Sequence, residues 1–204
     1  MILSRRGALA ALAGTVLLTG RPGAAQEVAG PDPRALTHDP DQPVLGNPDG
    51  DVTLVGFFDY PCPYCRKAAP AIRKLVAEDG NIRLVLKDWP LFGPVSDHAV
   101  GIALGSVRLG RYPQVNAALL AGRGAVYVAG IDAAARKAGV DPAKALASFR
   151  RDRDRWGGLI ARNDLQAQML GLTGTPSYVV GWDVYLGETP VSTLKAAVAT
   201  ARKG

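Results

Sequence analysis

The sequence is poor in the residues that build metal clusters and disulfide scaffolds. It has two cysteines, two methionines and two histidines among 204 residues. Two cysteines exclude a disulfide-stapled mini-protein and any metal site with four cysteine ligands. Two methionines argue against a methionine-rich copper surface, and a metal at the cysteines would find only His38, His98 and carboxylates to complete its shell. We therefore expect no resident metal and no cofactor.

The excess of basic over acidic residues is also small once the first residues are set aside. The formal charge is +6, but Arg5, Arg6 and Arg21 lie in a stretch without acids, and removing them leaves +3. Residues 150–155 alternate Arg with Asp, a pattern typical of a solvated helix face. A nucleic-acid interface would need clustered basic charge with aromatic residues, and aromatics make up only 6% of the chain. We expect no nucleic-acid partner.

Residues 1–25 have the organisation of an export signal. Arg5 and Arg6 precede an uncharged run from Gly7 to Gly20, and small residues follow near position 25. The run is shorter than the roughly 20 apolar residues that span a bilayer. Around Arg5 the sequence SRRGAL is similar to a twin-arginine signal, with Ala8 where that pattern usually has Phe. An uncleaved anchor or a wrongly assigned start is the alternative, and the export route stays open.

The rest of the chain predicts an α/β protein with a helical interruption. Residues 26–50 are rich in proline and predict an extended leader. The apolar runs VTLVGFF (52–58) and IRLVL (82–86) predict buried strands, and a helix from Pro63 to about Ala77 lies between them. Strand, helix and strand in this spacing form a βαβ unit, so we expect the two strands to be parallel.

Further along, helices are expected first and a smaller sheet region second. Residues 96–170 are rich in Ala and Leu and predict four or five helices, with Asp132 and Asp141 as N-cap residues. Strands are expected at 177–180 and 184–186, and an amphipathic helix at 191–201. The α/β domain would thus consist of residues 51–95 and 171–204, with 96–170 inserted.

The chemistry is concentrated in Cys62-Pro63-Tyr64-Cys65, which follows the first buried strand and begins the first long helix. Pro63 suits the first helical position, which places Cys62 at the N-cap, where free N–H groups and the helix dipole favour a thiolate. Cys65 lies one turn further on, within reach of a disulfide. We expect Cys62 to be the exposed, acidic, attacking sulfur and Cys65 the shielded, resolving one. A structural disulfide, a metal site and inert buried thiols are the alternatives.

Three motifs in this order and spacing resemble the exported DsbA-like thiol:disulfide oxidoreductases. They are FFDYPCPYC (57–65), KDWP (87–90) and GTPS (174–177), and the resemblance covers residues 40–203. Pro70 also matches a proline in the active-site helix of thioredoxin-like proteins. The resemblance implies a thioredoxin-like fold, formed by 51–95 and 171–204, with an all-helical insertion at 96–170.

The resemblance also implies roles around the cysteines. Thr175-Pro176 would be a cis peptide bond facing the pair, with the Thr175 backbone, Pro63 and Tyr64 contacting substrate; a trans proline at an edge strand is the alternative. The sequence departs from the family pattern at Gly56, where DsbA-like proteins often have a buried acidic residue. Lys87 stands at the position of the basic partner of that acid. We therefore consider Lys87 and Asp59 as candidate proton relays, together with water.

For function, the motifs predict an exported dithiol oxidase that passes its disulfide to protein thiols, with Cys62 as nucleophile. The family implies reoxidation by a membrane quinone-linked partner. A disulfide isomerase or reductase is the alternative within the same fold, and a metal-handling or peptide-binding thiol protein is the alternative outside it. The proline-rich leader argues against an oligomerising helix and favours a monomer. The location would be periplasmic or otherwise extracytoplasmic.

Overall fold

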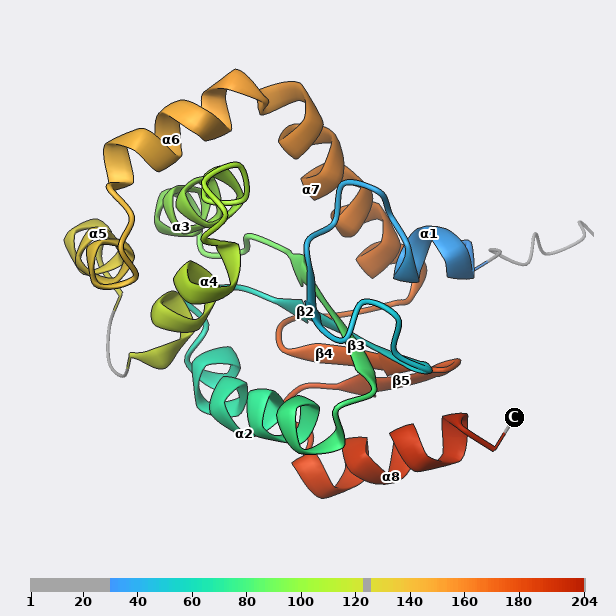
Figure 1. Ribbon diagram of the computed structural model, residues 1–204. Helices are drawn as coiled ribbons and strands as arrows, with labels where there is room; N and C mark the ends of the chain where they lie inside the picture. Colours follow the sequence, from blue (N-terminus) through green and yellow to red (C-terminus); the bar gives the residue numbers. More distant parts are fainter. Residues whose placement is uncertain (1–29, 123–125, 204) are drawn as a thin grey trace, which may run out of the picture.

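The computed structural model of the chain describes residues 30–122 and 126–203 (Figure 1). The predicted export signal, residues 1–25, lies outside the described residues. Within them, five strands form one mixed sheet in the order β1-β3-β2-β4-β5. The strands are β1 (Val44–Gly46), β2 (Val52–Phe58), β3 (Ile82–Asp88), β4 (Ser177–Val180) and β5 (Asp183–Leu186). Across the described ranges, no helix is both long and apolar enough to cross a bilayer.

The two central strands form where the longest apolar runs lie. β2 covers the predicted residues 52–58, β3 extends the predicted run to Asp88, and the two strands are parallel, as predicted. Helix α2 (Pro63–Asp79) connects them and ends at Gly80, whose φ of 73° suits glycine at the C-cap. Strand β4 pairs antiparallel with the other side of β2, so β2 lies between segments that are distant in the sequence.

Helices cover both faces of the sheet (Figure 1). On one face, α2 and α8 (Val191–Ala201) pack on side chains such as Leu54 of β2 and Leu84 of β3. On the other face, a smaller cluster joins the neighbouring residues of the same strands to α1 (Pro33–Thr37) and α7 (Arg153–Met169). Because successive strand residues face opposite sides, each central strand contributes to both clusters. This double burial accounts for the nearly continuous apolar runs in the sequence.

Between β3 and β4, the described residues form helices and no strand, as predicted for this stretch. They are α3 (Pro94–Gly105), α4 (Tyr112–Ala121), α5 (Val128–Lys137), α6 (Pro142–Arg151) and α7 (Arg153–Met169). Asp141 caps α6 by accepting a hydrogen bond from the Ala143 N–H at 2.8 Å, which confirms that N-cap. The division of the chain into a domain and an insertion stays a prediction.

The Asp132 N-cap was a wrong prediction. Helix α5 begins four residues earlier, after Tyr127, and Asp132 lies within it. Its carboxylate contacts the His98 ring of α3, with 2.8 Å between Asp132 Oδ1 and His98 Nε2. Asp132 therefore connects two helices instead of starting one.

The predicted extended leader also needs correction, because it contains helix α1 and strand β1. Pro33 occupies the first turn of α1, where it needs no N–H partner, and Asp32 accepts a hydrogen bond from the Arg34 N–H at 2.9 Å. Gln42 further ties the segment to the sheet by donating to the Leu86 carbonyl at 2.8 Å. The prolines limit the helix to five residues but do not prevent it.

Candidate active site

Both cysteines lie at the junction of β2 and α2. Cys62 is the N-cap residue of α2, and the backbone N–H of Cys65 donates to its Sγ at 3.5 Å. Across the sheet, the Cys62 Sγ lies 3.3 Å from the carbonyl oxygen of Thr175, to which the thiol donates. The cysteines are both free in this structure, so it represents the reduced form of the pair.

The surroundings make the two thiols very different acids. A hydrogen bond from the Cys65 side chain lowers the pKa of Cys62 to about 6; the Thr175 side chain and backbone N–H groups add to this, against the opposing effect of burial. For Cys65, burial is the largest influence, and together with the neighbouring Cys62 sulfur it raises the pKa far above the ordinary value of 9.0. When the pair ionises, Cys62 therefore loses its proton first and holds the negative charge.

The structure corrects the expectation that Cys62 is exposed. Cys62 is 2% exposed and Cys65 is 4% exposed, so both are buried. Cys62 is covered because its sulfur lies against the segment that contains Thr175. The asymmetry between the two sulfurs is therefore one of charge and not of accessible surface.

The Thr175–Pro176 peptide bond is cis, as the resemblance implied. It directly precedes β4, and β4 pairs with β2, so this bond and the cysteines lie at the same end of adjacent strands. Tyr64 is 56% exposed and Pro63 is also exposed. Beside them is an open hollow of about 300 Å³, lined by Tyr64, by residues 173–177 and by Gly187 and Glu188, which follow β5.

Comparison with known proteins agrees with this geometry. The sequence profile of a protein family described as Thioredoxin matches residues 38–200. The chain belongs to the thioredoxin family. Its structural relatives within that family include DsbA-like thiol-disulfide oxidoreductases.

Solved structures of three thioredoxin-family proteins support this assignment. A thioredoxin-like oxidoreductase from Silicibacter pomeroyi is 40% identical, with a TM-score of 0.80, over 85% of this chain and 99% of that one. A periplasmic thioredoxin-like protein from Salmonella enterica serovar Typhimurium is 29% identical, with a TM-score of 0.71, over 84% and 95%. The thiol-disulfide exchange protein alpha-DsbA2 from Wolbachia pipientis is 27% identical, with a TM-score of 0.75, over 82% and 90%.

Part of a much longer protein also matches. The Na(+)/H(+) antiporter NhaA 1 of Salinispora arenicola is 32% identical over 171 residues, which is 81% of this chain and 26% of that protein. A second antiporter, NhaA 3 of Salinispora tropica, is 31% identical over 168 residues and 25% of its length. The chain thus spans about a quarter of the curated relatives that it matches.

One candidate relay of this thioredoxin-family chain, Lys87, lies away from the cysteines. In the register of β2 and β3, Lys87 pairs with Phe57, whereas Gly56 pairs with Leu86, so Lys87 faces the opposite side of the sheet from Gly56. Its Nζ donates to Asn163 of α7 at 3.3 Å. Burial lowers the pKa of Lys87 to about 8. The structure does not bring Lys87 together with the pair.

The other candidate relay, Asp59, holds the loop that follows β3. Its Oδ2 accepts hydrogen bonds from the Leu91 N–H at 2.7 Å, the Phe92 N–H at 3.3 Å and the Ser96 hydroxyl at 2.7 Å. Only the Asp59 backbone meets the active-site turn, where its carbonyl accepts from the Cys62 N–H at 3.2 Å. Burial raises the pKa of Asp59 despite these donors. Asp59 Oδ2 is thus committed to the loop, whereas its buried Oδ1 has no hydrogen-bond partner within the described ranges.

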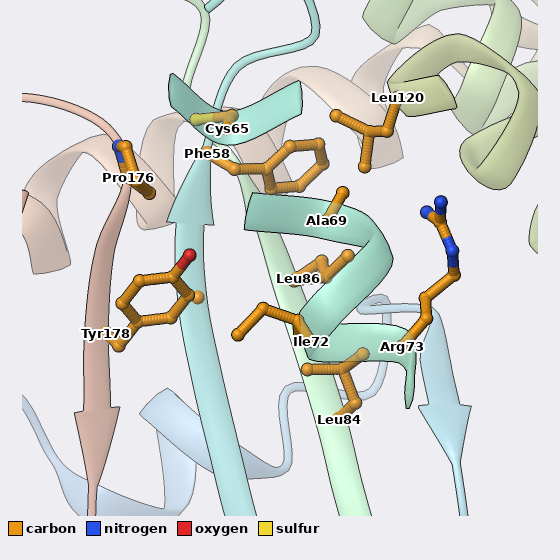
Figure 2. A pocket seen from close by; sticks show the side chains of 11 residues that line it. Phe58, Cys65, Ala69, Ile72, Arg73, Leu84, Leu86, Leu120, Pro176 and Tyr178 are labelled. Carbon is orange, nitrogen blue, oxygen red and sulfur yellow. The ribbon is translucent and has the colours of Figure 1, made fainter. Parts of the chain in front are cut away.

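Sequence reasoning missed two buried groups near the site. Tyr178 pairs with Gly56 across β2 and β4 and lines a small cavity under Cys65 (Figure 2). Asp88, the last residue of β3, is fully buried, and neither of its carboxylate oxygens has a hydrogen-bond partner within the described ranges. Burial raises the pKa of Asp88 to about 8, and the nearby Asp59 adds to the rise. A tyrosine and an aspartate in apolar strand contexts gave no signal by themselves.

Proposed function

We propose that the chain is an extracytoplasmic dithiol oxidase that transfers its disulfide to protein substrates through Cys62 and Cys65. In the oxidised form, a substrate thiolate attacks the Cys62 sulfur, a mixed disulfide forms and Cys65 leaves as a thiolate. A second substrate thiolate then attacks the substrate's sulfur in that bond and releases Cys62 as a thiolate. The substrate loses two electrons and gains a disulfide, and the pair becomes the reduced dithiol.

The observation that carries this proposal is the difference in acidity between the two sulfurs. Cys62 has its pKa lowered to about 6 and Cys65 has its pKa raised, although only three positions separate them. A stabilised Cys62 thiolate favours the reduced form, which makes the disulfide a stronger oxidant, and an acidic thiol is also a good leaving group. These properties suit a protein that gives its disulfide away.

The surface beside the pair supports contact with an extended protein segment. Thr175 precedes the first residue of β4, and its carbonyl accepts a hydrogen bond from the Cys62 thiol. A substrate strand that replaced this contact would reach the same carbonyl and place its own sulfur at Cys62. Exposed Pro63 and Tyr64, together with the adjoining hollow, would receive the flanking side chains.

Location and partners are part of the same proposal. The predicted export signal at residues 1–25 would deliver the chain to the periplasm or an equivalent compartment, where protein thiols become oxidised. The chain would act as a monomer on exported proteins with cysteine thiols. A membrane quinone-linked protein would accept the two electrons of the reduced pair.

Disulfide formation in a reduced, unfolded protein tests the proposal. The oxidised chain should introduce disulfides, and Cys62→Ser should abolish the reaction. Reduced Cys65→Ser, mixed with the same protein in its disulfide form, should accumulate a mixed disulfide on Cys62, because the Cys62 thiolate attacks the substrate disulfide, one substrate sulfur leaves as a thiolate, and no Cys65 is present to release the other. Equal trapping by the two single variants would contradict the assigned roles.

The redox potential of the pair separates the oxidase from its alternative. A potential near about −120 mV would match a strong oxidant, and one near about −270 mV would match a reductant. Equilibration with glutathione buffers of defined composition measures it. A value at the reducing end would replace the oxidase with a reductase or isomerase.

A further inference from the structure

A small cavity lies directly under the cysteine pair, on the α2 face of the sheet. Its volume is about 30 Å³, and its walls include Gly56, Cys65, Pro176 and Tyr178. The other lining residues, apart from Arg73, are apolar (Figure 2): Phe58, Ala69, Ile72, Leu84, Leu86 and Leu120. A cavity of this volume can hold one water molecule, which needs on the order of 10–15 Å³.

The position of the Tyr178 ring beside the cavity depends on the absence of a side chain at Gly56. Gly56 and Tyr178 are direct cross-strand partners of β2 and β4. A Cβ atom built on Gly56 would lie 3.4 Å from the Tyr178 ring and 3.1 Å from a methyl group of Leu86. Because glycine has no side chain, the phenol ring covers the strand at the position from which an acidic side chain would otherwise project.

The Tyr178 hydroxyl and Cys65 lie toward the same end of this cavity. Figure 2 shows the Tyr178 hydroxyl directed toward the end where Cys65 and Pro176 lie. Tyr178 is only 4% exposed. Arg73 lies at the opposite wall, and its buried Nη1 has no partner within the described ranges. Cys65 is the cysteine that lines the cavity, at the end toward which the hydroxyl points.

We propose that the Tyr178 hydroxyl stabilises the Cys65 sulfur as an anion, by a hydrogen bond relayed through one water molecule in this cavity. Tyr178 is then a positioning residue for Cys65, in place of the buried acid that Gly56 cannot supply. This inference rests on the proposed thiol–disulfide exchange, and it adds the group that makes the resolving sulfur reactive.

The phenol suits this role because it keeps its proton. Burial, together with the two sulfurs and Glu188, raises the pKa of Tyr178 above its ordinary value of 10.0. At neutral pH it is a hydrogen-bond donor and not a base. Cys65, with its raised pKa, carries charge only briefly, when it attacks or leaves, and a neutral donor favours that charged state over the thiol.

Reaction of the reduced chain with glutathione disulfide isolates the step concerned. The Cys62 thiolate attacks one glutathione sulfur, a Cys62–glutathione bond forms, and the other glutathione leaves as a thiolate. The Cys65 thiolate then attacks the Cys62 sulfur, the Cys62–Cys65 bond forms and the second glutathione leaves. The Cys65 proton passes through water to a departing glutathione. The cysteines lose two electrons, and the glutathione disulfide gains them.

Tyr178→Phe, which removes one oxygen atom, is the test variant. We expect the second step to slow by about tenfold, the usual scale for one hydrogen bond to a charged group. The Cys62–glutathione intermediate should accumulate, as seen by mass spectrometry after acid quenching. Alkylation of Cys62 across the pH range should give the wild-type pKa. Tyr185→Phe is the matched control, since Tyr185 pairs with Tyr178 across the strand but does not line the cavity.

The results separate the inference from the proposed function. The inference would be overturned if Cys65 of Tyr178→Phe displaced glutathione from Cys62 at the wild-type rate. It would also be overturned if the first and second steps slowed equally, or if Tyr185→Phe slowed the second step as much as Tyr178→Phe. Glutathione disulfide reacts with the two thiols whatever the natural substrates are. If Cys65 resolves the Cys62–glutathione intermediate as inferred but the protein oxidises no protein substrate, only the proposed function is contradicted.

Discussion

Lowering the pKa of Cys62 should make the reduced protein more stable than the disulfide form, by an amount that grows with pH. Folding lowers this pKa from the ordinary 9.0 to about 6. A group whose pKa is lowered by folding adds stability that is complete above 9.0 and is lost as the pH falls through about 6. The disulfide form has no thiolate and lacks this contribution.

The magnitude follows from the two pKa values. Linkage gives about 0.1 kcal/mol at about pH 5, about 1.4 kcal/mol at pH 7 and about 2.7 kcal/mol at about pH 8. The value at pH 7 corresponds to about 30 mV of added oxidising power for a two-electron couple. Asp59, Lys87 and Asp88 are present in both redox forms, so their titrations largely cancel in the difference.

Denaturant unfolding of both redox forms at several pH values measures this difference. Closure of the disulfide loop adds a constant offset, so only the slope with pH is interpreted. A difference that changes by less than about 0.5 kcal/mol between about pH 5 and about pH 8 would refute the reasoning. Reduced Cys62→Ala, compared with the disulfide form, is the control and should show no such slope.

Three further predictions concern stability, each measured by denaturant unfolding. The free energy of unfolding of Asp88→Asn should rise relative to that of the wild type as the pH goes from about 4 to about 8, by up to about 4 kcal/mol at pH 7, because Asp88 of the folded wild type keeps a proton that the unfolded chain releases. Equal pH dependence of the two free energies would contradict this. Gly105→Ala should cost about 1–3 kcal/mol because its methyl group would overlap a backbone carbonyl of α6, whereas Gly130→Ala, in open space, should gain about 0.5–1 kcal/mol; equal effects would be inconsistent with that packing. Arg162→Gln should cost about 1–3 kcal/mol at neutral pH, because Arg162 donates to buried Asp39 at 2.6 Å, and the loss should disappear once acid protonates Asp39.

The sequence predicted the elements where one physical signal dominates. Strand β2 and helix α8 have the predicted bounds because continuous burial and amphipathic spacing each leave a clear pattern. The Cys62 N-cap followed from Pro63 at the first helical position. Asp132 shows the limit of such signals: aspartate suits an N-cap, but it also suits a contact between helices, and residue type alone does not distinguish the two.

The surroundings of the site depended on strand register, which one sequence does not provide. A shift of one residue moves a side chain to the other face of a sheet. The observed register places Lys87 with Asn163 on the far face and pairs Tyr178 with Gly56 on the near one. The resemblance suggested Lys87 as a candidate proton relay, and nothing in the sequence connected Tyr178 to a glycine more than a hundred positions away.

The pairing of β2 with β4 has an evolutionary consequence. Cys62 and Thr175 are 113 positions apart, yet their separation in space is fixed by two adjacent strands. The helices α3 to α7, which lie between β3 and β4 in the described part of the chain, are therefore not needed to set that separation. Changes in the length of these helices can therefore leave Cys62 and Thr175 in place.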